Sequence, residues 1–250
     1  MNPYFEEMRD LNLDKFLNLD ENREPNHLGL YRMNCLVIGK TGSGKTTVLL
    51  KALLTDAIDD FSLLIFIIPR ESMESGFYKK LSQAVRAGRI KKNIIFVIIG
   101  EEDLPTIQKL NEISNQVKGR IAIVLDDFIN AFKKDEWLIF KRYITQLSRV
   151  KYGASLFCLT QNWRQIGEPA YRKNFNAFIL FVNSLRRENF AEILTSYFDH
   201  YSFNKNEISQ LYNIFKQDPH QPLWLINGTD EEESMLYDGM YIYPDELLES

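Results

Sequence analysis

The sequence predicts an α/β fold, a three-layer sandwich in which helices cover both faces of a mostly parallel β-sheet. Short apolar runs recur along the chain and are nearly continuous, as in strands that are buried on both faces. Stretches with a helical spacing of apolar residues separate these runs, and alternation of strand and helix is typical of a parallel sheet. A glycine-rich turn joins the first predicted strand to the first predicted helix.

The predicted strands are bounded by glycine, proline or charged residues. They lie at about 33–38, 63–68, 93–99, 121–125, 155–160 and 176–182. Helices are predicted at 45–58, 77–87, 103–116, 135–151, 188–199 and 206–217, with a short strand around 223–225. Within 135–151 the residues Trp137, Phe140, Tyr143 and Leu147 recur with helical spacing, so this stripe is expected to pack on the core.

Length and composition indicate one domain with additional segments at both ends. A chain of 250 residues, 45% hydrophobic and 26% charged, can bury a large core. We expect the α/β domain with its C-terminal helices over 31–228, an acidic arm over 1–30 and an acidic tail over 229–250. The longest apolar runs are far shorter than the ~20 residues of a membrane-spanning helix. The start lacks the features of a secretory signal, so the protein is expected to stay where it is made.

The number and placement of cysteines and histidines, and the net charge, bear on whether the protein binds zinc or nucleic acid. The two cysteines, Cys35 and Cys158, lie in predicted strands, where packing is the expected role, and the three histidines are too scattered for a zinc cluster. The formal net charge of -4 disfavours a surface uniformly coated with positive charge for nucleic acid. Basic pairs such as Lys133 with Lys134 still allow a local groove.

A phosphate-binding loop is predicted over 39–46, which matches Gly-x-x-x-x-Gly-Lys-Thr, the Walker A pattern. Its glycines allow backbone conformations that turn N–H groups inward, and the helix that follows adds partial positive charge. Lys45 would neutralise the β- and γ-phosphates of ATP, and the Thr46 hydroxyl would complete the Mg²⁺ shell. The predicted nucleotide-binding residues are Gly39, Lys40, Thr41, Gly42, Ser43, Gly44, Lys45, Thr46 and Thr47.

Polar residues end two later strands. The run 121–127 has the Walker B form: Asp126 is expected to hold Mg²⁺ through water, and Asp127 to orient or deprotonate the water that attacks the γ-phosphate. A helix-capping pair of aspartates is the alternative. Gln161, after the run 156–160, could contact the γ-phosphate or the attacking water and report whether ATP is intact. A polar turn without such a role is the alternative.

Other nucleotide-binding classes fit less well. The guanine-reading pattern Asn-Lys-x-Asp has its nearest match at 204–207, which ends in glutamate and precedes a helix, so Asn206 is interpreted as an N-cap. A small-molecule kinase needs no strand ending in paired acids followed by a strand with a polar end. The order of the three motifs points to the additional-strand, RecA/FtsK-like group of P-loop ATPases.

The loop, the Asp126–Asp127 strand, Arg149 before the next strand, and Gln161 at its end together resemble the FtsK/HerA-type ATPases. More narrowly, they resemble the genome-packaging ATPases of poxviruses, other large cytoplasmic DNA viruses and virophages, over about 33–182. The resemblance implies a homo-oligomeric ring that uses ATP and Mg²⁺ to drive double-stranded DNA into a preformed capsid. It also implies capsid proteins as partners, and a place in the host cytoplasm, the viral factory or the virion.

The catalytic base and the functional arginine each have a second candidate residue. The superfamily usually carries glutamate where this chain has Asp127, and Glu71, just beyond the strand at 63–68, is the competing base. Arg149 is expected at the amino edge of the sheet, far from ATP at the carboxyl edge, and is therefore predicted to serve the neighbouring subunit's ATP. An arginine that satisfies a helix C-terminus is the alternative. Arg164 is the competing functional arginine.

Alternative functions remain at this stage. Another FtsK/HerA-type DNA pump, serving conjugation or plasmid transfer, would carry the same catalytic motifs. A nucleotide-dependent assembly switch or scaffold would bind ATP and change partners without translocation.

Overall fold

The computed structural model describes residues 33–54, 61–87, 95–128, 132–197, 203–218, 220–226, 234–237 and 240–242. The described chain forms two compact units. The first contains the segment Cys35–Lys45 and the residues from Thr160 onward, and the second contains Thr46–Leu159. The acidic arm predicted over 1–30 lies outside the described residues, and the predicted domain bounds stay a prediction.

The second unit is built on parallel strands in the order β3-β2-β4-β5. These are β2 (Phe61–Ile68), β3 (Ile95–Gly100), β4 (Arg120–Asp126) and β5 (Ala154–Thr160), and each neighbouring pair is parallel. Side chains of β5 are buried at every position, and those of β4 at all but the first. Burial on both faces explains why the sequence of these strands is continuously apolar rather than alternating.

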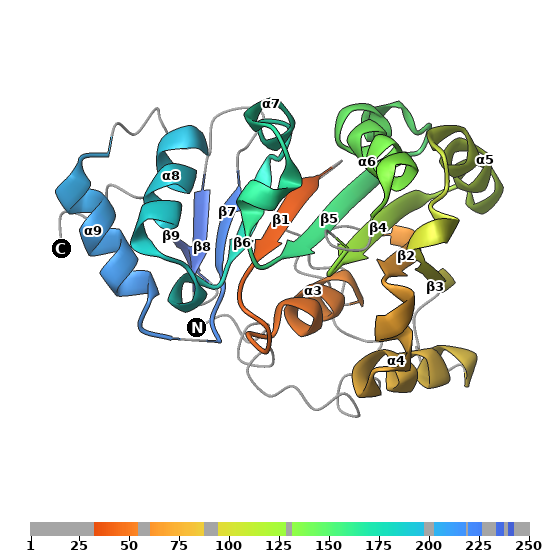
Figure 1. The fold of residues 1–250 in the computed structure, drawn as a ribbon, viewed down its shortest axis with the longest axis horizontal. Helices are drawn as coiled ribbons and strands as arrows, with labels where there is room; N and C mark the ends of the chain where they lie inside the picture. The colour runs from red at the N-terminus through yellow and green to blue at the C-terminus, as the bar shows by residue number, and fades with distance from the viewer. Residues whose placement is uncertain are drawn as a thin grey trace. The chain divides into compact units, whose positions relative to one another are not determined.

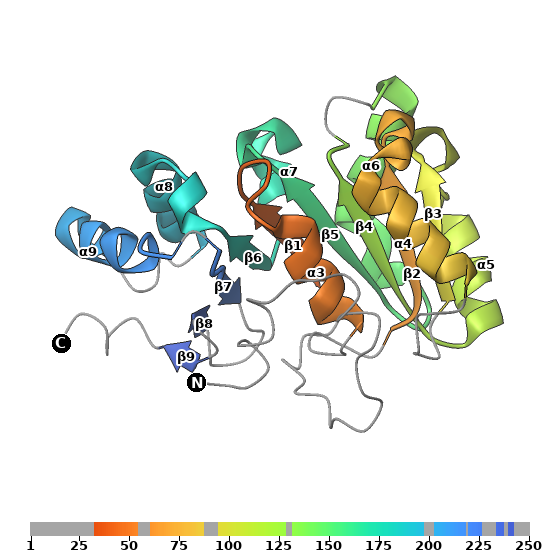
Figure 2. The ribbon, with the colours of Figure 1, turned by 90° about the horizontal axis from the view of Figure 1, so that it is seen from below.

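Helices cover both faces of these strands. The helices α3 (Lys45–Leu54) and α4 (Gly76–Arg86) lie on one side, and α5 (Ile107–Val117) and α6 (Lys134–Gln146) lie on the other (Figures 1 and 2). On α6 the stripe predicted from the sequence faces the core, with Phe140, Tyr143 and Ile144 buried. The predicted α/β class and layered architecture are confirmed.

Short 3₁₀ turns connect several elements: η1 (Arg70–Glu74), η2 (Glu101–Asp103) and η3 (Leu147–Arg149). The helix predicted over 135–151 is too long, because α6 ends at Gln146, where φ is -133° and leaves the helical range. The chain then continues into η3. Arg149 therefore lies on a 3₁₀ turn and not on the helix.

The first unit contains the strands β1-β6-β7-β8-β9 in that order. β1 (Asn34–Ile38) is parallel to β6 (Ala177–Leu180), and β6 is antiparallel to β7 (Leu223–Ile226). β8 (Ser234–Tyr237) and β9 (Met240–Ile242) continue the antiparallel pairing. These last two strands fall in the predicted acidic tail, where no strand was predicted from the sequence. With four and three residues, they are at or below the shortest run in which a two-residue periodicity can be recognised.

The helical elements of the first unit are η4 (Trp163–Ile166), α7 (Pro169–Arg172), η5 (Val182–Ser184), α8 (Arg187–Tyr197) and α9 (Lys205–Phe215). Phe190 of α8 packs its ring on Tyr212 and Phe215 of α9, at centroid distances of 5.6 and 6.5 Å. The N-cap of α9 is Asn204, not Asn206. Its side-chain oxygen accepts hydrogen bonds from the backbone of Asn206 and Glu207, and Glu207 caps Asn204 in return.

Both cysteines are buried, which fits the packing role predicted for them. Burial raises the pKa of the Cys35 thiol well above its ordinary value, so the thiolate form is suppressed. Among the residues that the structure describes, no helix has the length and apolar character needed to cross a bilayer.

Candidate nucleotide site

The phosphate loop connects β1 to α3 and has the backbone conformation that its glycines allow. Gly42 and Gly44 have φ values of +79° and +96°, in the left-handed region. A residue with a Cβ pays roughly 1–2 kcal/mol for that conformation, so glycine at both positions is a structural requirement of the loop.

Gly39 is required for a different reason, which is close packing. A Cβ added there would lie 2.5 Å from Ser43 Oγ and 3.0 Å from Phe181 Cβ. Phe181 follows β6, is fully buried, and packs against the loop at Gly39. Ser43 Oγ is buried and has no hydrogen-bond partner among the described residues. A buried hydroxyl left unpaired costs free energy, so the loop suits a ligand that carries hydrogen-bonding oxygens.

Lys45 folds back over the loop. Its ammonium donates hydrogen bonds to the carbonyl oxygens of Gly39 and Lys40, at 2.8 and 3.0 Å. Phosphate oxygens are stronger acceptors for an ammonium than neutral carbonyls are, so a nucleotide can replace these partners. The loop residues therefore fit the phosphate group that the sequence predicts.

We expect Lys45→Ala to weaken ATP binding by about 10- to 100-fold, since a charged hydrogen bond contributes about 1.5–3 kcal/mol. ATP turnover should fall with it. Lys80→Ala is the matched control, because Lys80 is an exposed lysine of α4, outside the loop. Equilibrium titration with a fluorescent ATP analogue measures both variants. Wild-type affinity and turnover in Lys45→Ala would remove the phosphate-loop assignment.

Thr46 follows Lys45 directly and begins the part of α3 that belongs to the second unit. Its hydroxyl donates to Asp126 Oδ2 at 2.6 Å. Asp126 ends β4 and is only 8% exposed. The structure thus brings together the two residues that the sequence predicts as Mg²⁺ ligands. A hydroxyl beside a carboxylate is a donor set of hard oxygen atoms, which suits Mg²⁺.

Tyr78 is a third member of this cluster, and it was not among the residues predicted from the sequence. It lies in the first turn of α4, and its hydroxyl donates a hydrogen bond to the same Oδ2 of Asp126. Burial, and then the nearby charge of Asp126, raise the pKa of Tyr78 well above its ordinary value, so the hydroxyl stays protonated. The available signal was positional: α4 follows β2, whose carboxyl end lies beside that of β4.

Asp127 differs from Asp126 in backbone conformation and exposure. β4 ends at Asp126, and Asp127 has a φ of +54°, in the left-handed region, with an exposed side chain. Aspartate and asparagine tolerate this conformation better than most residues with a Cβ. One carboxylate of the predicted pair is therefore buried and hydrogen-bonded, whereas the other is exposed to solvent. This division is compatible with one metal ligand and one base.

Glu71, the competing base, is also exposed and lies on η1, after the carboxyl end of β2. The register pairs Ile67 of β2 with Leu125 of β4, so both candidate bases follow strands that end at the same edge.

Gln161 follows β5 in a turn next to the phosphate loop. The Gly39 N–H donates to the Thr160 carbonyl at 3.2 Å, and the Asn162 N–H donates to Thr160 Oγ1 at 3.1 Å. Gln161 is exposed between these two anchored neighbours. Its predicted role as a γ-phosphate sensor is compatible with this position.

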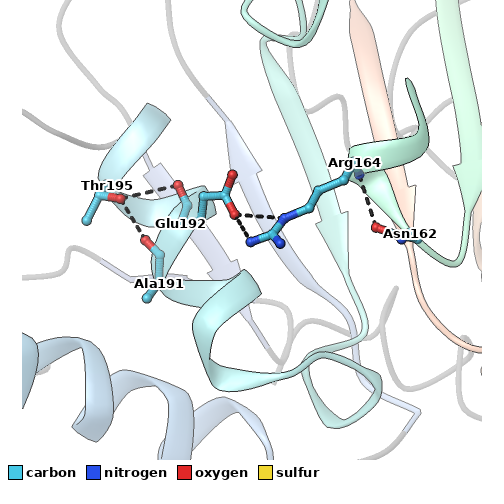
Figure 3. Close-up of polar contacts among 5 residues, drawn as sticks. All are labelled: Asn162, Arg164, Ala191, Glu192 and Thr195. Atoms are coloured by element: carbon cyan, nitrogen blue, oxygen red, sulfur yellow. Dashed lines mark hydrogen bonds and ion pairs between the residues drawn. The ribbon is translucent and has the colours of Figure 1, made fainter. Parts of the chain in front are cut away.

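Arg164, the competing functional arginine, is engaged with Glu192 of α8 (Figure 3). Its Nε donates to Glu192 Oε2 at 3.0 Å, and its Nη2 donates to the same oxygen. The side chains are 53% and 34% exposed, so the ion pair contributes at most about 1 kcal/mol and can be exchanged for another anion.

Arg149 is exposed on η3, ahead of the amino end of β5. β5 is parallel to β4, and Ala154 at its start pairs with Ile121, whereas Leu159 pairs with Asp126. Arg149 is therefore near the amino edge, as the sequence predicts, although it lies on a 3₁₀ turn.

No protein-family model matches the sequence, and no curated protein sequence matches it. Solved structures do match. The crystal structure of B204, the DNA-packaging ATPase from Sulfolobus Turreted Icosahedral Virus, matches with a TM-score of 0.52 at 13% identity, covering 83% of this chain and 97% of that chain. The genome packaging NTPase B204 from Sulfolobus turreted icosahedral virus 2, in complex with sulfate, matches with a TM-score of 0.51 at 16% identity, covering 82% and 94%. The chain therefore has the α/β P-loop fold of these packaging ATPases, and the predicted resemblance is confirmed at the level of the fold.

Proposed function

We propose that this chain is an ATPase that moves double-stranded DNA into a preformed capsid. The observation that carries the proposal is the Walker A loop running directly into Thr46, whose hydroxyl bonds Asp126 of the Walker B strand at 2.6 Å. The fold shared with two viral packaging ATPases favours genome packaging over other uses of a P-loop.

Each site residue has a distinct task in the proposed hydrolysis. Lys45 exchanges its carbonyl partners for oxygens of the β- and γ-phosphates. Thr46 and Asp126 would hold Mg²⁺, Asp126 through water, and the ion would supply neutralisation of charge on the transferring phosphoryl group. Asp127 orients the attacking water and accepts its proton, and Gln161 contacts the γ-phosphate or that water.

The DNA contact is proposed to be mainly with phosphates, because a packaging motor must act on any sequence. The net charge of -4 does not prevent this, since exposed basic residues occur in local groups. Those in the described part of the chain include Lys133, Lys134, Arg142, Lys173, Arg186 and Arg187. The chain is further proposed to form a homo-oligomeric ring with capsid proteins as partners. The ring would act in the host cytoplasm, the viral factory or the virion.

We expect double-stranded DNA to stimulate ATP hydrolysis, and turnover per chain to rise with protein concentration as rings assemble. Steady-state ATPase measured against protein concentration, with and without DNA, tests both. A motor that neutralises 6–10 phosphates should lose about 10³- to 10⁵-fold in DNA affinity between about 50 and 200 mM salt. Lys45→Ala corrects for contaminating ATPase. ATPase that DNA fails to stimulate at low salt would favour a non-translocating assembly switch instead.

A further inference from the structure

We propose that Tyr78 is a positioning residue for the magnesium site, in which its hydroxyl fixes the orientation of the Asp126 carboxylate. This inference rests on the proposed function, since it assumes that Thr46 and Asp126 hold Mg²⁺. Neither the Walker motifs nor the sequence neighbourhood of Asp126 includes Tyr78.

Two hydrogen-bond donors converge on one oxygen of Asp126. The hydroxyls of Thr46 and Tyr78 both donate to Asp126 Oδ2. The donors come from different helices, α3 and α4, so rotation of the carboxylate would break contacts with both. Partners that orient a metal-binding carboxylate strengthen metal binding because the ligand is already in place when the ion arrives.

Tyr78 is itself held in place by the packing of α4. Its side chain is 7% exposed, and Leu81 and Ala84 of the same helix are buried as well. The backbone of the first turn is fixed by the Lys79 N–H, which donates to the Ser75 carbonyl at 2.9 Å. The hydroxyl is therefore presented to Asp126 from a packed helix and not from a mobile loop, which makes it an effective orienting group.

The competing explanation is that Asp126 merely satisfies a buried tyrosine hydroxyl. Tyr143 supplies the control, because it is also buried in the second unit and its hydroxyl donates to the Pro105 carbonyl. Phenylalanine keeps the ring at either position, so no cavity forms. Both variants lose one buried hydroxyl, but only the Tyr78 variant loses a partner of Asp126.

The test measures equilibrium binding of a fluorescent, non-hydrolysable ATP analogue to the full chain over a series of Mg²⁺ concentrations and in EDTA. We expect Tyr78→Phe to raise the Mg²⁺ concentration for half-maximal enhancement of binding by about 10-fold, with binding in EDTA unchanged. Tyr143→Phe should leave both values unchanged. In an Asp126→Asn background, Tyr78→Phe should cause no further shift.

The outcomes separate the two proposals. An unchanged Mg²⁺ midpoint in Tyr78→Phe, or an equal shift in Tyr143→Phe, would overturn the role of Tyr78 while leaving the ATPase assignment intact. Wild-type protein that binds the analogue without any Mg²⁺ dependence would instead overturn the magnesium site itself, and the inference about Tyr78 with it.

Discussion

Arg149→Ala should lower ATP turnover by about 10³- to 10⁵-fold while leaving ATP binding intact, because the guanidinium is expected to stabilise the γ-phosphate of a neighbouring subunit. The register of β4 and β5 argues against a role of Arg149 at the ATP of its own subunit. Arg149 precedes Ala154, which pairs with Ile121, and Asp126 lies at the opposite end of that pairing. At about 3.3 Å per residue, the two levels are roughly 17 Å apart along the strands, more than one arginine side chain covers.

Mixed subunits distinguish action in trans from a local structural role. Arg149→Ala and Lys45→Ala should each be nearly inactive alone, and their mixture should recover part of the ATPase, because some interfaces then pair an intact loop with an intact arginine. Arg86→Ala is a matched control, since Arg86 is an exposed arginine at the end of α4. Full activity of Arg149→Ala alone would refute the proposal, and Arg164 would then be the arginine to test.

Asp127→Asn should slow hydrolysis by about 10²- to 10⁴-fold, the usual contribution of a general base, while Mg²⁺·ATP binding persists. The metal ligand Asp126 is untouched by this change. Asparagine is also the best replacement for the backbone, because it tolerates the left-handed φ of +54° that Asp127 adopts. Single-turnover hydrolysis, measured beside nucleotide binding, separates loss of chemistry from loss of affinity.

Glu71→Gln is the companion variant for the base assignment. Glu71 is exposed on η1 and follows a strand that ends at the same edge as β4. We expect Glu71→Gln to keep most of the turnover. Normal turnover in Asp127→Asn together with a large loss in Glu71→Gln would show that the base had been assigned to the wrong carboxylate.

Most elements of the fold could be predicted because their signals are local. The continuous apolar runs of β2, β4 and β5 report burial on both faces, and each run lies within a few residues of the observed strand. The end of α6 was misplaced because Leu147 continues the apolar stripe into a 3₁₀ turn and remains buried. The periodic pattern alone does not distinguish that turn from a last turn of α-helix.

Within the candidate site, the contact between Thr46 and Asp126 could be predicted because each residue belongs to a motif of adjacent residues. Tyr78 and the Arg164–Glu192 pair belong to no such motif. Their contacts join residues that are 48 and 28 positions apart in the chain. Nothing in the sequence near either residue marks the partner.

The sequence by itself determined the phosphate loop, the strand that ends in two aspartates and the layered α/β class, because glycine conformations, apolar runs and helix starts depend on neighbouring residues. Only the tertiary structure decided that Asp126 is buried between two hydroxyl donors while Asp127 turns into a left-handed conformation and stays exposed. The physical reason is that packing of the sheet sets the strand order and register. These in turn determine that the first turns of α3 and α4 lie at the end of β4.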